Sequence, residues 1–413
     1  MNKKTIDNKY YFSLLLYIFP VCIFFDFSIG YFDDREFWVI GQALVLFLVL
    51  FFGIFFNKRI NYTKPSKWLF FLSLFLCLTV PFSSNITHTI NMLLKFTLSS
   101  FFYIYSYHYV RNEFDIFKIF KFVIFACLMS YLFFAFSTFF EIGRTAYKNQ
   151  FLYFGYQSLA TQFIFCIMLI ATYFFRGKIF KRNYSHYIFS AITIIILILS
   201  FRRTNFLILL LGLLFLILKL GLIKHFFLRF VPILILIMLT FGDFISDDIS
   251  KVLEKRERIL NLGSYKNEGR LVESKLVLDH LSDSWITIFF GAGELFNSAN
   301  NYGFYSGDLN TYTRPVHNDY ARILFGGGFI ALFLYLIFLI SLFLNIIKNK
   351  PLLDTSSNIF LLYNFNIFLI ISLFFIGFSS GLTDVFYRLV IMSLLGASSK
   401  ILTLNKLRQN QLN

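Results

Sequence analysis

The chain has 413 residues, of which 58% are hydrophobic and only 15% are charged, whereas soluble domains carry about 25% charged residues. This composition excludes an ordinary soluble domain, a disordered chain and a fibrous protein, and it predicts an integral membrane protein with many spans. The net charge of +16 lies in short basic clusters between apolar runs, a pattern that indicates orientation in a bilayer rather than a nucleic-acid-binding surface.

Apolar runs long enough to cross a bilayer as helices, about 20 residues each, follow one another along most of the chain. About twelve spans are predicted, at residues 10–29, 37–56, 67–82, 88–107, 117–140, 151–175, 186–201, 205–223, 226–245, 317–347, 358–379 and 384–404. No small-residue cleavage site follows the first run, so we expect a span there rather than a cleaved signal peptide. Gly326-Gly327-Gly328 interrupts the tenth run, which is therefore either one long helix or two segments.

The expected fold is all-α, with spans in residues 1–245 and 317–413 and a loop over residues 246–316 between the ninth and tenth spans. Lysine and arginine gather in every second connection, which predicts cytoplasmic N and C termini. The inner segments hold Lys3, Lys4, Lys9, Lys58, Arg59, Lys64, Lys67, Arg111, Lys118, Lys121, Arg176, Lys178, Lys181, Arg182, Lys219, Lys224, Arg229, Lys348, Lys350, Lys400, Lys406 and Arg408. The short outer loops hold Arg35, Arg144, Lys148, Arg202 and Arg203.

The loop over residues 246–316 is about 70 residues long and lies on the periplasmic side in this topology. Two helices are predicted in it, Lys251–Leu260 and the amphipathic segment Glu268–Leu281, which we expect to lie on the membrane surface as a lid. The tail over 297–315 is rich in Asn, Gly and Tyr and is typical of a loop. A loop of this length in a compact protein is usually functional.

Arginines stand at the outer membrane boundary in three places. Arg202 and Arg203 lie between the seventh and eighth spans, Arg270 opens the amphipathic segment, and Arg314 precedes the tenth span. Because guanidinium groups bind phosphate bidentately and keep their charge, these positions predict an anion site. The plainer interpretations are interfacial anchoring for the Arg202–Arg203 pair, a solvated helix face or an ion pair with Glu273 for Arg270, and an isolated loop charge for Arg314.

His317 stands at the entrance of the tenth span, beside Asn318 and Asp319. An unperturbed histidine titrates at about 6.5, so this side chain is a candidate general base for a hydroxyl. The alternative is a hydrogen-bonding residue at a helix start, where either Asn318 or Asp319 is the cap. Asp26 and Lys95 are charged residues inside predicted spans, and we expect both near the outer ends.

Sites of other kinds are not indicated. No group of His, Cys and Asp has the spacing of metal ligands. The four cysteines lie inside apolar runs without a CxxC pair, which predicts buried small side chains rather than disulfides or zinc ligands. Gly291-Ala292-Gly293 is too short for a phosphate-binding loop and is interpreted as a turn.

Short motifs follow one another in a definite order between about residues 190 and 345. They are Ser200-Phe201-Arg202-Arg203, Gly269-Arg270, Gly291-Ala292-Gly293, Val316-His317-Asn318-Asp319-Tyr320 and Gly327-Gly328. In this order, and with the long loop between spans nine and ten, the chain resembles the O-antigen ligase and O-antigen polymerase superfamily of bacterial envelope enzymes.

The resemblance implies a membrane glycosyltransferase of the C type in the bacterial inner membrane, without a metal ion or other cofactor. Such enzymes act at the periplasmic face on oligosaccharides carried by undecaprenyl diphosphate. Their functional residues correspond to Arg202 or Arg203, to Arg270 and to His317, and we add Arg314 as a further candidate for diphosphate binding. The expected partners are the lipid-linked oligosaccharide, membrane lipid, and the chain-length regulator and flippase of the same pathway, but not nucleic acid.

The polymerase and the ligase share this signature. We favour the polymerase because the His-Asn-Asp-Tyr form is more similar to polymerases, which are also the more diverse group. A lipid-linked oligosaccharide flippase fits the number of spans, but the internal repeats typical of transporters are not visible. A non-catalytic protein of envelope assembly is the remaining alternative.

Overall fold

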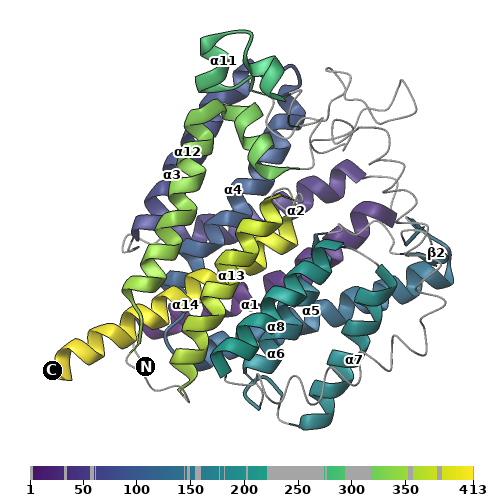
Figure 1. Cartoon of the computed structure of the whole chain (residues 1–413), viewed down its shortest axis with the longest axis vertical. Coiled ribbons are helices and arrows are strands. Elements are labelled where there is room, and N and C mark those ends of the chain that lie inside the picture. The colour runs from purple at the N-terminus through teal and green to yellow at the C-terminus, as the bar shows by residue number, and fades with distance from the viewer. Residues whose placement is uncertain are drawn as a thin grey trace.

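Helices make up most of the part of the chain that the computed structural model describes (Figure 1). The described residues are 3–31, 35–55, 60, 62–143, 145–146, 149–153, 160–175, 177–180, 182–200, 203–220, 274, 277–293, 318–351, 357–378 and 384–412. The predicted helical membrane protein is therefore confirmed in kind.

The helices follow the predicted order. In the first half they are α1 (Lys3–Tyr31), α2 (Arg35–Leu50), the π-helical turn η1 (Phe51–Phe55), α3 (Lys64–Thr79), the 3₁₀ turn η2 (Val80–Phe82), α4 (Ile86–Tyr109) and α5 (Glu113–Phe139). The hairpin β1 (Thr145–Ala146) and β2 (Asn149–Tyr153) comes next, followed by α6 (Thr161–Phe174), α7 (Asn183–Ser200) and α8 (Arg203–Leu220). The last elements are α11 (Trp285–Phe290), α12 (Asp319–Lys348), α13 (Asn358–Gly377) and α14 (Val385–Leu412).

Among the described residues, seven helices are long and apolar enough to cross a membrane. They are Lys9–Ile29, Phe37–Ile54, Lys64–Phe82, Glu113–Phe139, Asp319–Lys348, Asn358–Gly377 and Val385–Gln411, and shorter apolar helices lie at Thr161–Phe174, Asn183–Ile198 and Thr204–Ile217. Each predicted span overlaps a helix except 226–245, which lies outside the described residues. The total of about twelve spans stays a prediction.

The predicted span over 151–175 begins later than expected. Its first residues belong to β2, which pairs antiparallel with β1, and α6 begins only at Thr161. At Tyr153 the backbone N–H donates to the hydroxyl oxygen of Thr138 and the carbonyl accepts from it, at 3.2 and 3.1 Å. Because these backbone groups are satisfied outside a helix, the apolar run does not need to be helical there.

Helix α12 is broken within the glycine run. Gly327 and Gly328 have non-helical dihedral angles, and Gly328 has φ 62° and ψ −163°, a conformation that side-chain-bearing residues rarely adopt. The tenth predicted span is therefore two helical segments, an outer one ending at Gly326 and an inner one running from Phe329 to Lys348.

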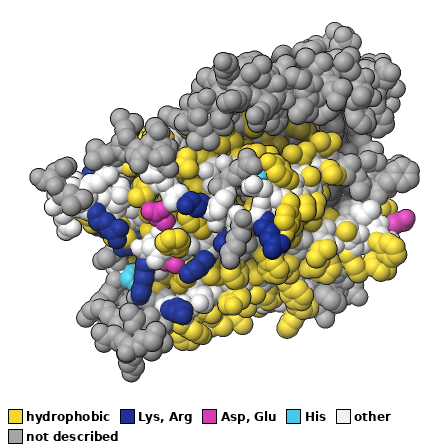
Figure 2. All heavy atoms as spheres, turned by 90° about the horizontal axis from the view of Figure 1, so that it is seen from below, with side chains coloured by type: hydrophobic (Ala, Val, Ile, Leu, Met, Phe, Trp, Pro, Cys, Tyr) yellow, Lys and Arg dark blue, Asp and Glu magenta, His cyan; other side chains and the backbone are white. Residues whose placement is uncertain are grey.

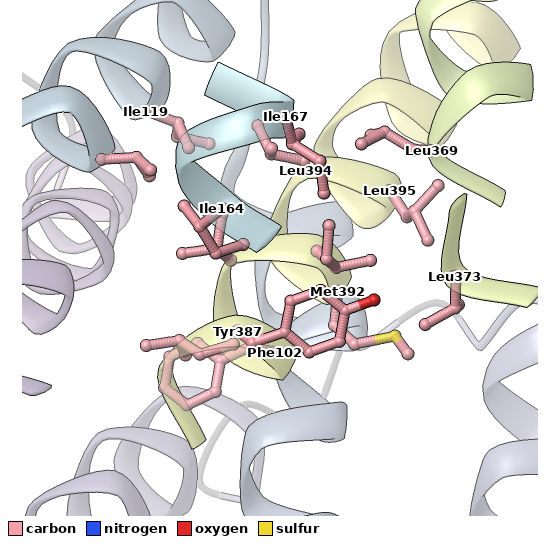
Figure 3. Close-up of a cluster of buried hydrophobic side chains, with 14 of the residues drawn as sticks. Phe102, Ile119, Ile164, Ile167, Leu369, Leu373, Tyr387, Met392, Leu394 and Leu395 are labelled. Atoms are coloured by element: carbon pink, nitrogen blue, oxygen red, sulfur yellow. The ribbon is translucent and has the colours of Figure 1, made fainter. Parts of the chain in front are cut away.

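The core is built around α14, whose most apolar stretch is 94% buried. Helix α4 runs alongside α14, and Gly396 lies directly against the backbone of Tyr103, where a larger side chain would clash. Figure 3 shows Tyr387, Met392, Leu394 and Leu395 of α14 clustered with Phe102 of α4, Ile119 of α5, Ile164 and Ile167 of α6, and Leu369 and Leu373 of α13. Inside a bilayer, such close packing replaces the hydrophobic effect as the force that joins helices.

Basic side chains gather at the lower end of the bundle, where both chain ends lie (Figures 1 and 2). Helix ends meet there: Asn358 donates to Glu113 at 3.1 Å, the Lys118 ammonium lies 5.7 Å from the Phe12 ring centroid, and Lys406 donates to the Lys348 carbonyl. Lys118, Lys348 and Lys406, which belong to three of the predicted inner segments, thus lie at one end of the described structure, while the orientation of the termini stays a prediction from the charges.

Candidate functional site

Most of the predicted site residues lie outside the described part of the chain. These are Arg202, Arg270, Arg314 and His317, while Arg203 is described only as the first residue of α8. Their mutual geometry stays a prediction. The residues that follow two of them in the sequence are described, however, and these show how α12 and α8 begin.

The start of α12 is capped and anchored. The side chain of Asn318 accepts from the backbone N–H groups of Tyr320 and Ala321 at 3.0 and 3.4 Å, so Asn318 rather than Asp319 is the N-cap. The Tyr320 hydroxyl donates to the carbonyl of Phe374 at 2.8 Å, which ties this first turn to the end of α13. The chain is therefore anchored to the bundle from Asn318 onward, the residue that directly follows His317 in the sequence.

The start of α8 is held by a second set of buried polar contacts. Asn205 is fully buried and donates to the side-chain oxygen of Gln162 at 2.9 Å. The neighbouring Thr161 donates to a carboxylate oxygen of Asp384 at 3.5 Å, just before α14 begins. The first turns of α6 and α8 and the residue before α14 therefore meet at one level of the bundle, close in sequence to Arg203.

Arg388 on α14 was not singled out from the sequence. Its side chain is 1% exposed, and its Nη1 lies 3.5 Å from the Ser100 hydroxyl oxygen. The guanidinium carbon lies 4.7 Å above the ring centroid of Phe96, and the side chain also hydrogen-bonds Tyr335 of α12. A charge inside an apolar predicted span was the available signal. The sequence could not supply its partners on α4 and α12.

Asp26 on α1 is a second charged residue inside a predicted span, and it is half-buried. Its carboxylate accepts from Gln42 Nε2 at 2.8 Å and lies within electrostatic range of Lys95 and Asp384. Asp384 immediately precedes α14, at the end of the bundle opposite the basic side chains. The expectation that Asp26 and Lys95 lie near the outer ends of their spans agrees with this placement.

The Gly291-Ala292-Gly293 motif does more than form a turn. Its backbone docks on the broken middle of α12, where the Ala292 N–H donates to the Phe325 carbonyl at 2.9 Å and the Gly293 N–H to the Gly326 carbonyl at 3.1 Å. A Cβ atom on Gly291 would stand 2.5 Å from the backbone nitrogens of Gly327 and Gly328. Residues 291–293 and 326–328 thus form one unit, here called the glycine clamp, which joins two motifs of the sequence signature.

The described end of the long loop packs on the outer segment of α12. Residues 277–281 are helical, and Val277 and Leu281 are buried against Ala321, Leu324 and Phe325. These residues are the described end of the segment 268–281, whose amphipathic helix stays a prediction over 268–273 and 275–276, and the predicted helix over 251–260 also lies outside the described part.

Short helix α11 follows and was not predicted. Its first turn is capped by Ser284, which accepts from the N–H of Ile286 at 3.1 Å. Trp285, Ile286 and Phe289 are exposed, as expected for a helix that lies in the interface of a membrane.

The four cysteines and the possible metal ligands were also compared with the predictions from the sequence. Cys22, Cys127 and Cys166 are buried and free as predicted, but Cys77 is exposed, because the outer face of a membrane helix is apolar and accepts a thiol as readily as the core does. Within the described ranges, no group of three or more His, Cys, Asp or Glu side chains could hold a metal ion.

The comparison with protein families gives a match in the second half of the chain. Residues 188–336 match the model of a family described as O-Antigen ligase. This range contains the long loop and every motif of the sequence signature, so the resemblance inferred from those motifs is confirmed. The comparison with curated proteins gave no match.

Proposed function

We propose that this chain, whose residues 188–336 match the family described as O-Antigen ligase, is a glycosyltransferase that polymerises a bacterial surface polysaccharide. It would transfer a glycan from undecaprenyl diphosphate to the next lipid-linked repeat at the periplasmic face of the inner membrane. The observation that carries the proposal is the family match itself, together with the seven helices among the described residues that are long and apolar enough to cross a membrane.

The proposed reaction is a displacement at the anomeric carbon. The acceptor hydroxyl oxygen attacks opposite the diphosphate, the bond from the anomeric carbon to the diphosphate oxygen breaks, and the configuration inverts. His317 accepts or orients the hydroxyl proton. The resemblance implies no metal ion, so fixed cations must stabilise the negative charge that develops on the leaving diphosphate.

Arg202 or Arg203, Arg270 and Arg314 are the candidates for these cations. Each hydrogen bond to a charged group contributes about 1.5–3 kcal/mol, and every 1.36 kcal/mol or so of transition-state stabilisation is about tenfold in rate. About two such contacts would therefore accelerate transfer by several orders of magnitude. The anchored starts of α8 and α12 support this assignment, because they fix the chain next to Arg203 and next to His317.

The ligase reaction, in which the finished glycan passes to lipid A–core, is the second candidate, and the description of the matched family favours it. We retain the polymerase because of the His-Asn-Asp-Tyr form of residues 317–320. A deletion strain separates the two. Lipid A–core carrying a single repeat without a ladder would support the polymerase, and bare core with long polymer still on undecaprenyl diphosphate would support the ligase.

The same strain also tests a flippase. Single repeats trapped on the cytoplasmic side would overturn both transfer reactions. His317→Ala provides the residue-level test, since an enzyme should lose transfer whereas a transporter should survive the change. His88→Ala is the matched control, because His88 lies in the first turn of α4 and has no part in the proposed chemistry. Equal activity of the two variants at normal membrane levels would remove His317 from the site.

A further inference from the structure

A buried polar cluster lies between α14 and the two segments of α12. It consists of Asp319 and Tyr335 on α12, Asp384 before α14, and Tyr387 and Arg388 on α14. All five side chains are 6% exposed or less. The Tyr387 ring lies within electrostatic range of the other four, and Tyr335 within range of both Arg388 and Asp319.

Burying such a cluster costs free energy that packing of the helices alone does not require. Charged side chains inside a membrane bundle are rare and usually functional, and buried ion pairs can often be replaced by apolar groups without loss of stability. Packing alone would be served as well by leucine at position 388. The planar guanidinium group of an arginine, in contrast, holds its hydrogen-bond partners in defined positions.

Arg388 has the contacts needed for that role. Its guanidinium reaches Ser100 and the Phe96 ring on α4, which runs alongside α14. On the other side it hydrogen-bonds Tyr335, on the inner segment of α12. The Tyr335 ring in turn packs against Tyr320, in the first turn of the outer segment, with the two ring centroids 6.0 Å apart. Arg388 therefore ties the inner segment of α12 to α4 and α14, and through the contact between Tyr335 and Tyr320 it also bears on the outer segment, before the break at Gly327 and Gly328.

We propose that Arg388 is a positioning residue for the transfer reaction, which holds the outer segment of α12 in register with α14. The inference rests on the proposed function, because the segment it holds begins directly after His317. Arg388 contacts Ser100, Phe96 and Tyr335, and its proposed effect on the reaction passes through α12. Displacing a reacting group by about 1 Å costs up to about 100-fold in rate.

The test uses the full-length protein in nanodiscs of phosphatidylethanolamine and phosphatidylglycerol, with an undecaprenyl-diphosphate-linked repeat as both donor and acceptor. The variants are Arg388→Met, Arg388→Lys and Tyr335→Phe. Arg408→Met is the matched control, because Arg408 lies on the same helix but is exposed. The measurements are kcat, KM and the thermal unfolding midpoint of each variant.

Arg388→Met is expected to lower kcat by about 10- to 100-fold while KM stays within about twofold, the pattern of an interaction that matters only in the transition state. Tyr335→Phe should show a smaller fall in kcat at an unchanged unfolding midpoint. Arg388→Lys keeps the charge and should recover part of the lost rate. Arg408→Met should match the wild type.

Two results would overturn the inference alone. One is wild-type kcat in Arg388→Met. The other is a loss of activity that follows the unfolding midpoint, with Tyr335→Phe and Arg388→Lys both folded and fully active, since Arg388 would then be structural only. If the wild type itself transfers nothing, the proposed function fails and the inference falls with it.

Discussion

The backbone N–H of Ala292 donates to the carbonyl of Phe325 across 2.9 Å, at the point where α12 is broken. A helix break leaves carbonyl groups without their helical partners, and each such group that meets lipid unpaired costs several kcal/mol. The turn after α11 supplies the missing donors. The glycine clamp thus explains how an irregular backbone persists inside an apolar helix.

Gly328→Ala should destabilise the protein by about 1–3 kcal/mol, the usual cost of holding a side-chain-bearing residue in a sparsely populated backbone region. A Cβ at this position would also clash with the Phe289 carbonyl group and stand 2.6 Å from the Gly291 nitrogen. Gly177→Ala is the matched control, because Gly177 has φ 81° but nothing within 4 Å of its would-be Cβ. Thermal unfolding in detergent measures both, and an equal effect would argue against the steric part of the clamp.

Asn318→Ala should cost about 1 kcal/mol of stability through loss of the N-cap, whereas Asn318→Asp should keep the cap. Asn112→Ala removes the equivalent cap of α5, where the side chain accepts from the N–H of Asp115 at 3.1 Å. We expect the two alanine variants to lose similar stability, but only Asn318→Ala to lower the rate of glycan transfer. Parallel unfolding and transfer assays decide this, and identical transfer rates would count against a functional position for the start of α12.

Asn205 and Gln162 should show coupled energetics. Asn205→Leu leaves the buried Gln162 amide without this partner and should cost about 1–3 kcal/mol. The double variant with Gln162→Leu should lose less than the sum of the two single changes, because both partners are then apolar. A double-mutant cycle of unfolding free energies measures the coupling, and strict additivity would show that this contact does not hold the start of α8.

The orientation of the bundle can be tested by labelling with a membrane-impermeant maleimide. In a background without native cysteines, Thr87→Cys should react in intact cells whose outer membrane has been permeabilised, because the first turn of α4 is expected to face the periplasm. Lys350→Cys should react only after the inner membrane is opened, because it belongs to the basic end of the bundle. The reverse pattern would invert the topology predicted from the charges.

The sequence predicts most helices because the bilayer imposes a length of about 20 apolar residues, which is visible without knowledge of the fold. The prediction fails where the backbone N–H and C=O groups of an apolar run find hydrogen-bond partners outside a helix. Residues 151–153 join a hairpin because Thr138 and β1 supply hydrogen bonds, and α11 is too short for a periodic pattern to be recognised.

Sequence predicts the candidate site less well than it predicts the helices. The motifs Gly291-Ala292-Gly293 and Gly327-Gly328 are visible, but their pairing depends on the folding of the chain between them. Likewise Arg388 is visible as a charge in an apolar run, whereas its contacts with Ser100 and Tyr335 come from distant parts of the chain. Only the assembled bundle determines such partners.

The break in α12 also bears on how this chain could be recombined with a relative. Residues 318–328 are bonded through their backbone to the end of the long loop and are separated from residues 329–348 by two non-helical glycines. The natural unit of exchange is therefore the loop together with these residues. A chimera that joins two chains after Gly328 keeps every hydrogen bond of the clamp within one parent, whereas a junction at 317 would divide them between two.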